Sequence, residues 1–318
     1  MNRSLGLVYG VLASLTFGTS GALAKPLMEA GWSPAATVTL RAGLAGILLL
    51  PIALVVLRGR WHLVVRARGR ILLMALIGVA GTQLVYFAAI ERIPVATGLL
   101  IEYLAPLMLV AWVAVTTRRL PGLVVLLGAA VAVGGLLLII GPVGGGDPLG
   151  YLFAALAAVG CAIYYLIAER PSQGLPGVVF AAASLLGGSA SLALVGAVGI
   201  VPFTFAFGDV HALGGIVPWW MPLVLLAATT AAGYSLSIAA SQRLGARLMS
   251  FVGMLEVVFA STFAWILLGE ELGLWQILGG GLILAGIALV RAEKTTPSDE
   301  TLPIADEPEP EPLPARVE

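Results

Sequence analysis

Long apolar stretches recur along nearly the whole chain, and they restrict its fold more than any other feature. A helix needs about 20 apolar residues to cross a bilayer, and stretches of this length follow one another here. Only 11% of the 318 residues are charged, whereas about a quarter are charged in a soluble domain. The stretches lack the polar–apolar alternation of barrel strands. The sequence therefore predicts an all-α polytopic membrane protein.

Breaks in hydrophobicity, marked by clusters of proline, glycine and arginine, divide these stretches into ten expected membrane spans. The Ala22-Leu23-Ala24 sequence resembles a signal-peptidase site, but the apolar run around it is longer than that of a signal peptide. We therefore expect a retained first span. The expected spans are 5–24, 34–57, 71–90, 95–116, 121–140, 149–168, 177–200, 218–240, 248–268 and 274–291.

The basic residues between these spans are distributed unevenly. With the N-terminus in the cytoplasm, nearly all of them fall on the cytoplasmic side, and only Lys25 and Arg92 fall outside. Cytoplasmic loops attract positive charge, so we expect a multi-pass plasma-membrane protein with both termini in the cytoplasm. The arginine-rich run RGRWHLVVRARGR is expected to contact anionic lipid headgroups. Since the net charge is zero, we expect no nucleic-acid partner.

The composition changes sharply at Glu293. From there the chain reads EKTTPSDETLPIADEPEPEPLPARVE, which is rich in proline and acidic residues and lacks aromatic ones. Such a segment cannot bury enough apolar surface to order itself. We expect a disordered, acidic cytoplasmic tail at 293–318.

The two halves of the apolar region resemble each other. At a separation of 151 residues, Arg92 falls on Arg243 and Gly128 on Gly279, and at 144 residues Leu5-Gly6 falls on Leu149-Gly150. Each half holds five spans, an odd number, so we expect two inverted five-helix repeats, at 1–146 and 147–292. Inverted repeats are characteristic of secondary transporters, with the substrate site at the repeat interface. Duplication for stability alone would also give a repeat.

Two longer motifs carry a family resemblance. The run ASQRLGARLMSFVGMLEVVFASTFAWILLGEELGLWQILGGGLILAGIALV at 240–290 closely resembles the second-half signature of EamA-type transporters in the drug/metabolite transporter superfamily. ERIPVATGLLIEYLAPL at 91–107 resembles the paired first-half motif, in the version of threonine/homoserine-type amino-acid exporters. The resemblance covers about 5–291. It implies ten spans in two inverted repeats, cytoplasmic termini, and export of amino acids or other small metabolites.

One departure from the family concerns the ninth expected span. There the family often has a proline after its glutamate, whereas Val257 follows Glu256 in this chain. Because of this departure, the sequence does not decide whether the helix is kinked at this point.

Three ionisable residues lie well inside the expected spans, namely Arg41, Glu102 and Glu256. A charge at that depth costs about 3 kcal/mol on insertion scales, so such residues are candidates for function. A helix-to-helix ion pair that only fixes packing is the structural alternative. At a rise of about 1.5 Å per residue, Arg41, Glu102 and Gln83 share one level in the membrane, and Glu256 approaches it from the opposite face.

The stretch LLIEYLAPL at 99–107 combines Glu102 with Pro106. Proline lacks an N–H, so the carbonyl of Glu102 is expected to lose its helical partner and the helix to kink. Broken helices at membrane depth are tolerated where they line a cavity. We therefore predict that this stretch forms one wall of a substrate site. The predicted ligands are Glu102, Arg41, Gln83, Glu256, Tyr103, Tyr164 and Tyr234, although core packing explains any one tyrosine alone.

The resulting hypothesis is a secondary transporter that exports a small polar metabolite, such as an amino acid, by alternating access. An acid in a poorly hydrated site could exchange a proton, which leaves proton coupling open. The alternative is an intramembrane enzyme acting on a lipid or isoprenoid, but the sequence has no acidic metal cluster, histidine-rich motif or Gly-x-Ser-x-Gly nucleophile. A channel or receptor would need a charge ring or an extramembrane domain.

No metal or cofactor is expected. His62 and His211 stand without other metal-ligand residues nearby in the sequence. The lone Cys161 lies within an expected span, where a small buried hydrophobe is the ordinary interpretation. The oligomeric state stays open.

Overall fold

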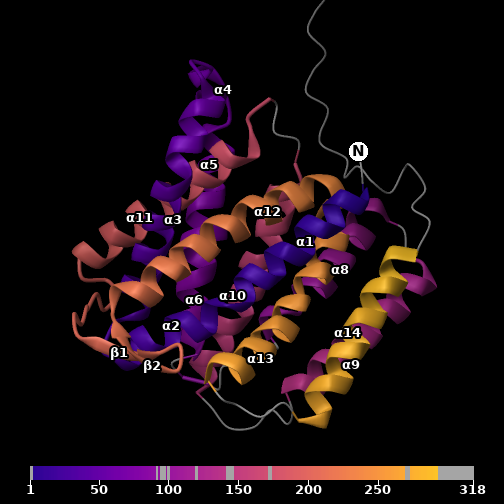
Figure 1. Cartoon of the computed structure of the whole chain (residues 1–318). Helices are drawn as coiled ribbons and strands as arrows, with labels where there is room; N and C mark the ends of the chain where they lie inside the picture. The colour runs from indigo at the N-terminus through magenta and orange to yellow at the C-terminus, as the bar shows by residue number, and fades with distance from the viewer. Residues whose placement is uncertain are drawn as a thin grey trace, which may run out of the picture.

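The computed structural model describes residues 3–90, 92–93, 98, 101–118, 121–140, 147–170, 174–268 and 273–292. The expected tail at 293–318 and much of 94–100 lie outside this part of the chain. The fold is a bundle of helices with one small hairpin (Figure 1). Its elements are α1 (Arg3–Gly18), α2 (Ser20–Glu29), α3 (Pro34–Leu57), α4 (Trp61–Arg66), α5 (Arg68–Leu73), the π-helix η1 (Met74–Gly81), α6 (Thr82–Ile90), α8 (Ala105–Thr117), α9 (Leu123–Ile140), α10 (Pro148–Glu169), α11 (Gly177–Ala197), β1 (Asp209–Ala212), β2 (Gly215–Pro218), α12 (Trp220–Gly253), α13 (Leu255–Leu268) and α14 (Leu274–Ala292).

Within the described residues, six helical runs are long and apolar enough to cross a membrane. They are 3–29, 34–57, 68–89, 148–169, 177–197 and 220–253, and shorter apolar helices cover 105–117, 123–138 and 277–290. The predicted class, an all-α polytopic membrane protein, agrees with these helices. The number of ten spans stays a prediction.

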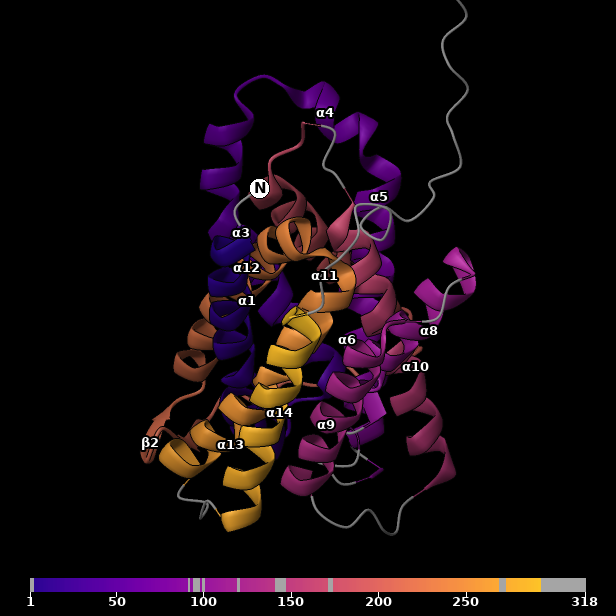
Figure 2. The same cartoon turned by 90° about the vertical axis from the view of Figure 1, so that its right-hand side faces the viewer.

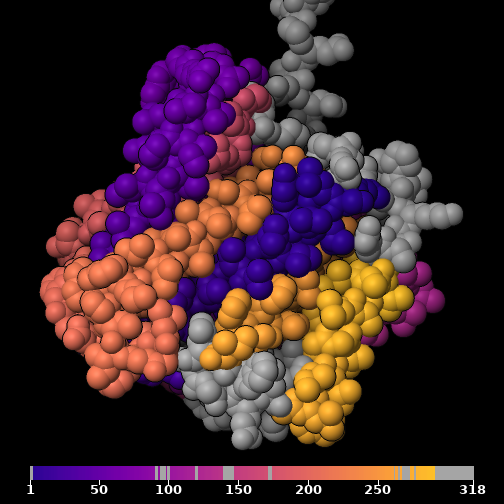
Figure 3. All heavy atoms as spheres, viewed as in Figure 1, coloured from indigo at the N-terminus to yellow at the C-terminus, as the bar shows by residue number. Residues whose placement is uncertain are grey.

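The two ends of the bundle differ in shape. The region of α4 and α5 projects from one end, which also carries Arg3, and we call this end the terminal face (Figures 1 and 3). The antiparallel hairpin of β1 and β2 lies at the other end, the hairpin face. There the Trp32 indole N–H donates to the Ala206 carbonyl at 2.6 Å, and the Ser33 N–H donates to the Thr204 carbonyl at 3.1 Å. These bonds join the α2–α3 connection to the segment that leads into the hairpin.

The third expected span is one continuous helical run from α5 through η1 to α6, and its middle has π-helical geometry. At the end of η1, the Thr82 hydroxyl donates to the Ile77 carbonyl at 2.7 Å. A side chain thus bonds to a backbone carbonyl at the return to α-helix. Such π-helical segments are frequent at functional sites.

The fourth expected span is broken close to Glu102. Residues 101–102 are helical, Tyr103 and Leu104 form a turn, and α8 begins at Ala105. Pro106 therefore lies in the first turn of a new helix, where a missing N–H is harmless, instead of kinking a continuous one. The turn is tightened by a bond from the Leu104 N–H to the Ile101 carbonyl at 3.1 Å.

The eighth and ninth expected spans differ from the helices observed. Gly245 has a φ of 81°, which glycine adopts readily, and turns the chain inside α12 with no separate loop. A second break at Met254 separates α12 from α13, so the expected span 248–268 is interrupted just before Glu256. At this break, the Met254 N–H bonds to the Phe251 carbonyl at 3.1 Å, three residues back. The kink that the missing proline left open is present, and a tightened turn produces it.

Glycines at matching positions bring α9 and α14 together. A Cβ atom added to Gly128 would meet the Gly286 carbonyl oxygen at 2.9 Å, and one added to Gly135 would meet the Gly279 oxygen at 2.5 Å. At the separation of 151 residues, Gly128 corresponds to Gly279 and Gly135 to Gly286. The two contacts therefore exchange when the halves are exchanged, and the helices run antiparallel (Figures 1 and 2). Small residues permit this close approach.

Two arginines form another exchanged pair of contacts. The Arg92 guanidinium lies over the Phe153 ring at 5.4 Å, and that of Arg243 lies over the Tyr9 ring at 5.1 Å. Arg92 corresponds to Arg243 at 151 residues, and Tyr9 corresponds to Phe153 at 144. The first helix of each half thus packs against a helix of the other half, at or near which this arginine lies: α10 against α6, which ends two residues before Arg92, and α1 against α12, which contains Arg243.

Candidate functional site

Arg41 is the buried cation of the bundle interior. The Ser33 hydroxyl caps α3 by accepting from the Ala36 N–H at 3.3 Å, and Arg41 follows two turns later with a side chain that is 4% exposed. No carboxylate in the described part of the chain forms an ion pair with it. Several acidic or phenolic groups nevertheless act on it electrostatically: Tyr234, Glu256, Tyr86 and Glu102.

The two carboxylic acids lie beside the two helix breaks. Glu102 directly precedes the turn at Tyr103, and Glu256 is the second residue of α13, just after the break at Met254. The two acids act on each other and on Arg41. Both are half-buried although they lie within apolar spans.

The acids differ in their hydrogen bonding. The Tyr103 side chain is a hydrogen-bonding partner of the Glu256 carboxyl group, so the break in the first half contacts the break in the second. Among the described residues, no hydrogen bond to the Glu102 side chain is found. Of the two acids, Glu102 is therefore the one without a hydrogen-bond partner in the described part of the chain.

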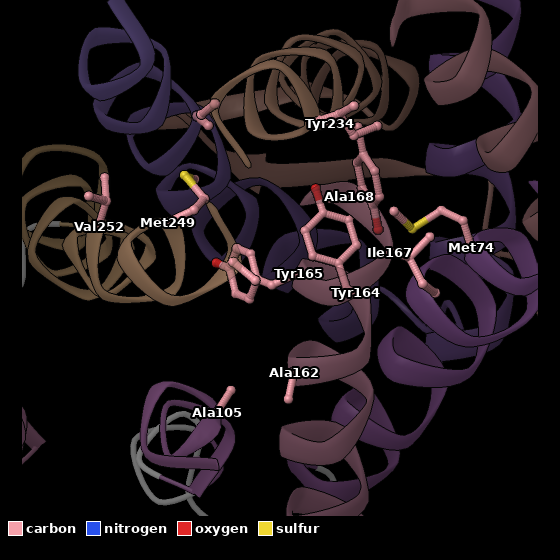
Figure 4. Close-up of a cluster of buried hydrophobic side chains, with 14 of the residues drawn as sticks. Met74, Ala105, Ala162, Tyr164, Tyr165, Ile167, Ala168, Tyr234, Met249 and Val252 are labelled. Atoms are coloured by element: carbon pink, nitrogen blue, oxygen red, sulfur yellow. The ribbon is translucent and has the colours of Figure 1, made fainter. Parts of the chain in front are cut away.

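Three tyrosine rings continue this region toward the terminal face. Tyr164 meets Tyr234 edge to face, with ring centroids 5.7 Å apart and planes at 87°, and meets Tyr165 at 5.3 Å and 74°. Figure 4 shows Tyr164 between the other two rings. The Tyr234 hydroxyl donates to the Gly78 carbonyl of η1 at 3.3 Å. The rings come from α10 and α12, and edge-to-face pairs of this kind add about 1 kcal/mol each beyond their burial.

The structure brings most of the predicted ligands into one electrostatic neighbourhood. The residues brought together are Arg41, Glu102, Glu256, Tyr103, Tyr164 and Tyr234. Gln83 lies half-buried near the start of α6, and no interaction among the described residues links it to this group. The role of all seven in binding a solute stays a prediction.

Three further residues, which are not among the seven predicted ligands, belong to the neighbourhood. Tyr86 acts on Arg41 and Glu102, and Tyr165 and Cys161 act on the acids. The signal for two of them was spacing on α10. Tyr164 and Tyr165 follow Cys161 by three and four residues, which puts all three on one helix face. Cys161 is half-buried and packs against the hydrophobic core, within electrostatic range of both acids.

The site offers one cation, two carboxylic acids and several phenolic hydroxyls to a single solute. Within the described ranges, no group of three histidine, cysteine, aspartate or glutamate residues could hold a metal ion. Together with the apolar helices, this polar neighbourhood inside the bundle defines the class: a multi-pass helical membrane protein with a group of ionisable side chains in its interior.

Comparison with known proteins gives the family. The model of the EamA-like transporter family matches residues 4–141 and again residues 148–292. The chain belongs to the EamA-like transporter family, and it is a transporter rather than an enzyme. The resemblance drawn from the two sequence motifs is confirmed, whereas the amino-acid exporter version of it stays a prediction.

Individual proteins agree with this assignment. The chain is 24% identical over 297 residues to a Salmonella typhimurium protein described as an uncharacterized inner membrane transporter YicL, covering 90% of this chain and 94% of that protein. A solved crystal structure shares the fold with a TM-score of 0.68 at 21% identity, over 91% of this chain and 98% of the other. The protein is a multi-pass inner-membrane transporter.

Proposed function

We propose that this transporter exports small polar metabolites such as amino acids by alternating access, with both termini in the cytoplasm. The observation that carries the proposal is the mixed set of charges formed by Arg41, Glu102 and Glu256. These residues come from α3, from the connection between α6 and α8, and from α13. They act on one another electrostatically, yet no direct ion pair joins them in the described part of the chain.

A free amino acid is complementary to this set. Its carboxylate fits the guanidinium of Arg41, which can bind a carboxylate through two parallel hydrogen bonds. Its ammonium group fits Glu102 and Glu256, and an ammonium group is also attracted to the faces of tyrosine rings. Charges within a membrane are costly when they lack partners, so a bound zwitterion would offset part of that cost.

The exchanged contacts support the inverted-repeat part of the proposal. The pair Gly128–Gly286 and the pair Gly135–Gly279 interchange when the halves are interchanged. The helix breaks at Tyr103 and Met254 also correspond at the separation of 151 residues. Two halves related in this way can open a shared site to one face and then to the other.

Proton coupling is the second part of the proposal. Two carboxyl groups that act on each other can share a proton, as Glu102 and Glu256 do act on each other. In proteoliposomes with an imposed pH gradient, solute flux should fall when a protonophore collapses the gradient. If the protonophore does not change the solute flux, transport is not coupled to protons, and the proposal of export is unaffected.

The test of export compares excreted and intracellular metabolites of three cell populations. These populations overexpress the wild type, Glu102→Gln at a matched membrane level, or nothing. We expect one class of small polar solute to accumulate outside only with the wild type. The matched control is Glu29→Gln, since Glu29 is an exposed acid at the end of α2 and its loss should leave export unchanged. Identical profiles for the wild type and the empty cells would contradict export.

A further inference from the structure

A contact within the second half lies at the terminal face, away from Arg41. Glu169, the last residue of α10, accepts a hydrogen bond from the Ala246 backbone N–H at 3.0 Å. Its other carboxylate oxygen lies 3.5 Å from the position that a Cβ on Gly245 would occupy. Ala246 follows the turn at Gly245, so its N–H is one that the helix cannot satisfy internally. Glu169 of α10 therefore caps the segment 246–253 of α12, and both belong to the second half of the chain.

Both elements joined by this hydrogen bond also border the candidate site. The capped segment 246–253 ends at the break at Met254, and Glu256 follows two residues later. The helix α10, which carries Glu169, also carries Cys161 and the tyrosines at 164 and 165. A displacement of the capped segment away from α10 would therefore move one wall of the site relative to the other.

A second contact of the same kind lies between Glu169 and the acids. Tyr234 of α12 packs edge to face on Tyr164 of α10, and its hydroxyl donates to the Gly78 carbonyl. The ring contact joins two helices of the second half, whereas the hydroxyl bond joins α12 to η1 of the first half. Two separate contacts thus hold α12 on the terminal-face side of the site.

The equivalent positions near the hairpin face cannot form these contacts. At the separations of 144 and 151 residues, Glu169 corresponds to Lys25, Tyr164 to Ser20 and Tyr234 to Gln83. Lys25 is exposed and pairs with Glu29 at 4.0 Å. The Ser20 hydroxyl is buried and lacks a hydrogen-bond partner among the described residues. In the described part of the chain, the contacts of Glu169 and Tyr234 therefore have no counterpart at these equivalent positions.

The charges around Glu169 favour the contact. Arg170 and Arg247 both act electrostatically on its carboxylate. Burial of this carboxylate is the larger influence and disfavours its charged form, whereas the bond from the Ala246 N–H and the two guanidinium groups favour it. An ionised acceptor makes the stronger hydrogen bond. A neutral side chain of the same shape should hold the Ala246 N–H less firmly.

We propose that Glu169 is a latch: while it holds the Ala246 N–H, the site is closed to the terminal face, and its release opens the site to that face. This inference rests on the proposed alternating access. Glu169 touches no solute in this scheme, so it acts as a positioning residue for the segment that leads to Glu256.

The reporter for the test is Cys161, the only cysteine of the chain. It is half-buried and lies within electrostatic range of both acids, so its labelling rate measures access to the site. A membrane-impermeant methanethiosulfonate reagent is added to one face at a time, in right-side-out and inside-out vesicles. The variant Cys161→Ser measures background labelling, and Asp209→Cys in that variant identifies the hairpin face.

For Glu169→Gln we expect labelling of Cys161 from the terminal face to be about tenfold faster. The hydrogen bond from the Ala246 N–H then has a neutral instead of a charged acceptor and is weaker. Labelling from the hairpin face should slow. Tyr234→Phe keeps the ring and loses the hydroxyl, so it should change labelling in the same direction but less. The control Glu29→Gln removes an exposed acid at the hairpin face and should label as the wild type does.

Two results would overturn the latch. In the first, Cys161 of Glu169→Gln is labelled from both faces at the wild-type rates. In the second, its labelling rate rises equally from both faces, which would indicate a general loosening of the fold. If Glu169→Gln does not reach the membrane, Tyr234→Phe decides by the same two criteria. Labelling requires no solute, so the two proposals can fail separately. If the wild type exports nothing but Glu169→Gln still shifts Cys161 labelling toward the terminal face, only the proposed function is contradicted. If the wild type exports but Glu169→Gln does not shift the labelling, only the latch is contradicted.

Discussion

The two halves of the molecule form the same helix break from different sequences. In the first half, Glu102 precedes a turn at Tyr103, and a proline lies in the first turn of the helix that follows. In the second half, the turn at Met254 comes first, Glu256 follows it, and no proline is present. The backbone is repeated, but the acid lies on opposite sides of the break. The comparison teaches that symmetry of the fold does not extend to the chemistry of the site.

Different surroundings follow from these different positions. Glu256 has the Tyr103 side chain as a hydrogen-bonding partner, whereas the described residues supply none to Glu102. Arg41 acts on both acids. We therefore expect Arg41 to be equally important for both acids, and the two acids to contribute unequally to transport.

The largest effect is expected from Arg41→Ala. This substitution leaves two half-buried acids without their positive neighbour, and losing such a partner costs about 3 kcal/mol or more, or more than about a hundredfold in flux. The measurement is solute flux in proteoliposomes at matched protein content. Arg41→Lys keeps the charge and should retain part of the flux. Wild-type flux in Arg41→Ala would contradict a shared role for this residue.

Gly135→Ala tests the symmetry of packing. Its Cβ would meet the Gly279 carbonyl oxygen at 2.5 Å, whereas a Cβ on the neighbouring Gly134 would meet nothing within 4 Å. Overpacking costs about 2 kcal/mol, so Gly135→Ala should lower the thermal unfolding temperature in detergent, and Gly134→Ala should not. The equivalent Gly286→Ala should be as costly as Gly135→Ala. A clear difference between those two would show that the halves pack unequally.

The difference in flux between the variants of the two acids is expected to be smaller than the effect of Arg41→Ala. We expect Glu102→Gln to reduce flux about tenfold more than Glu256→Gln does, because an amide can still accept from Tyr103, while Glu102 is available only to a solute. Both variants are measured in the same proteoliposome assay, with Glu29→Gln as the control. Equal losses would mean that the position of the acid relative to the break has no consequence.

The smallest effect is expected from Tyr103→Phe. The ring stays in place and one hydrogen bond to Glu256 is lost, which costs about 1 kcal/mol, or about fivefold in flux. In the Tyr103→Phe background, the two acids should become more alike. The check is to repeat the Glu102→Gln and Glu256→Gln measurements in that background and see whether the difference between them narrows. An unchanged difference would exclude Tyr103 as its source.

Much of the fold could be predicted from the sequence, because the thickness of the bilayer sets the length of each apolar span. The expected span 34–57 coincides with α3, and 149–168 lies within α10 at Pro148–Glu169. Element ends were harder to predict where no proline or loop marks them. The turn at Gly245 stays inside one helix, and the break at Met254 has no sequence mark of its own.

The candidate site was predictable only in part. A charge in an apolar span stands out in any sequence, so Arg41, Glu102 and Glu256 were found. Tyr86 and Cys161 look like ordinary span residues, and their place beside the charges depends on how separate helices pack. Gln83 had the right depth in the membrane, yet the described structure links it to none of the group.

The sequence by itself determined the class of the protein, its apolar helices, its family motifs and its intramembrane charges, because each depends on residues close together in the chain. Only the tertiary structure decided which helices meet, that the two breaks face each other through Tyr103 and Glu256, and that Glu169 of α10 caps the last segment of α12. These contacts join residues 77 or more positions apart, where the packing of helix on helix sets the distances and local sequence does not.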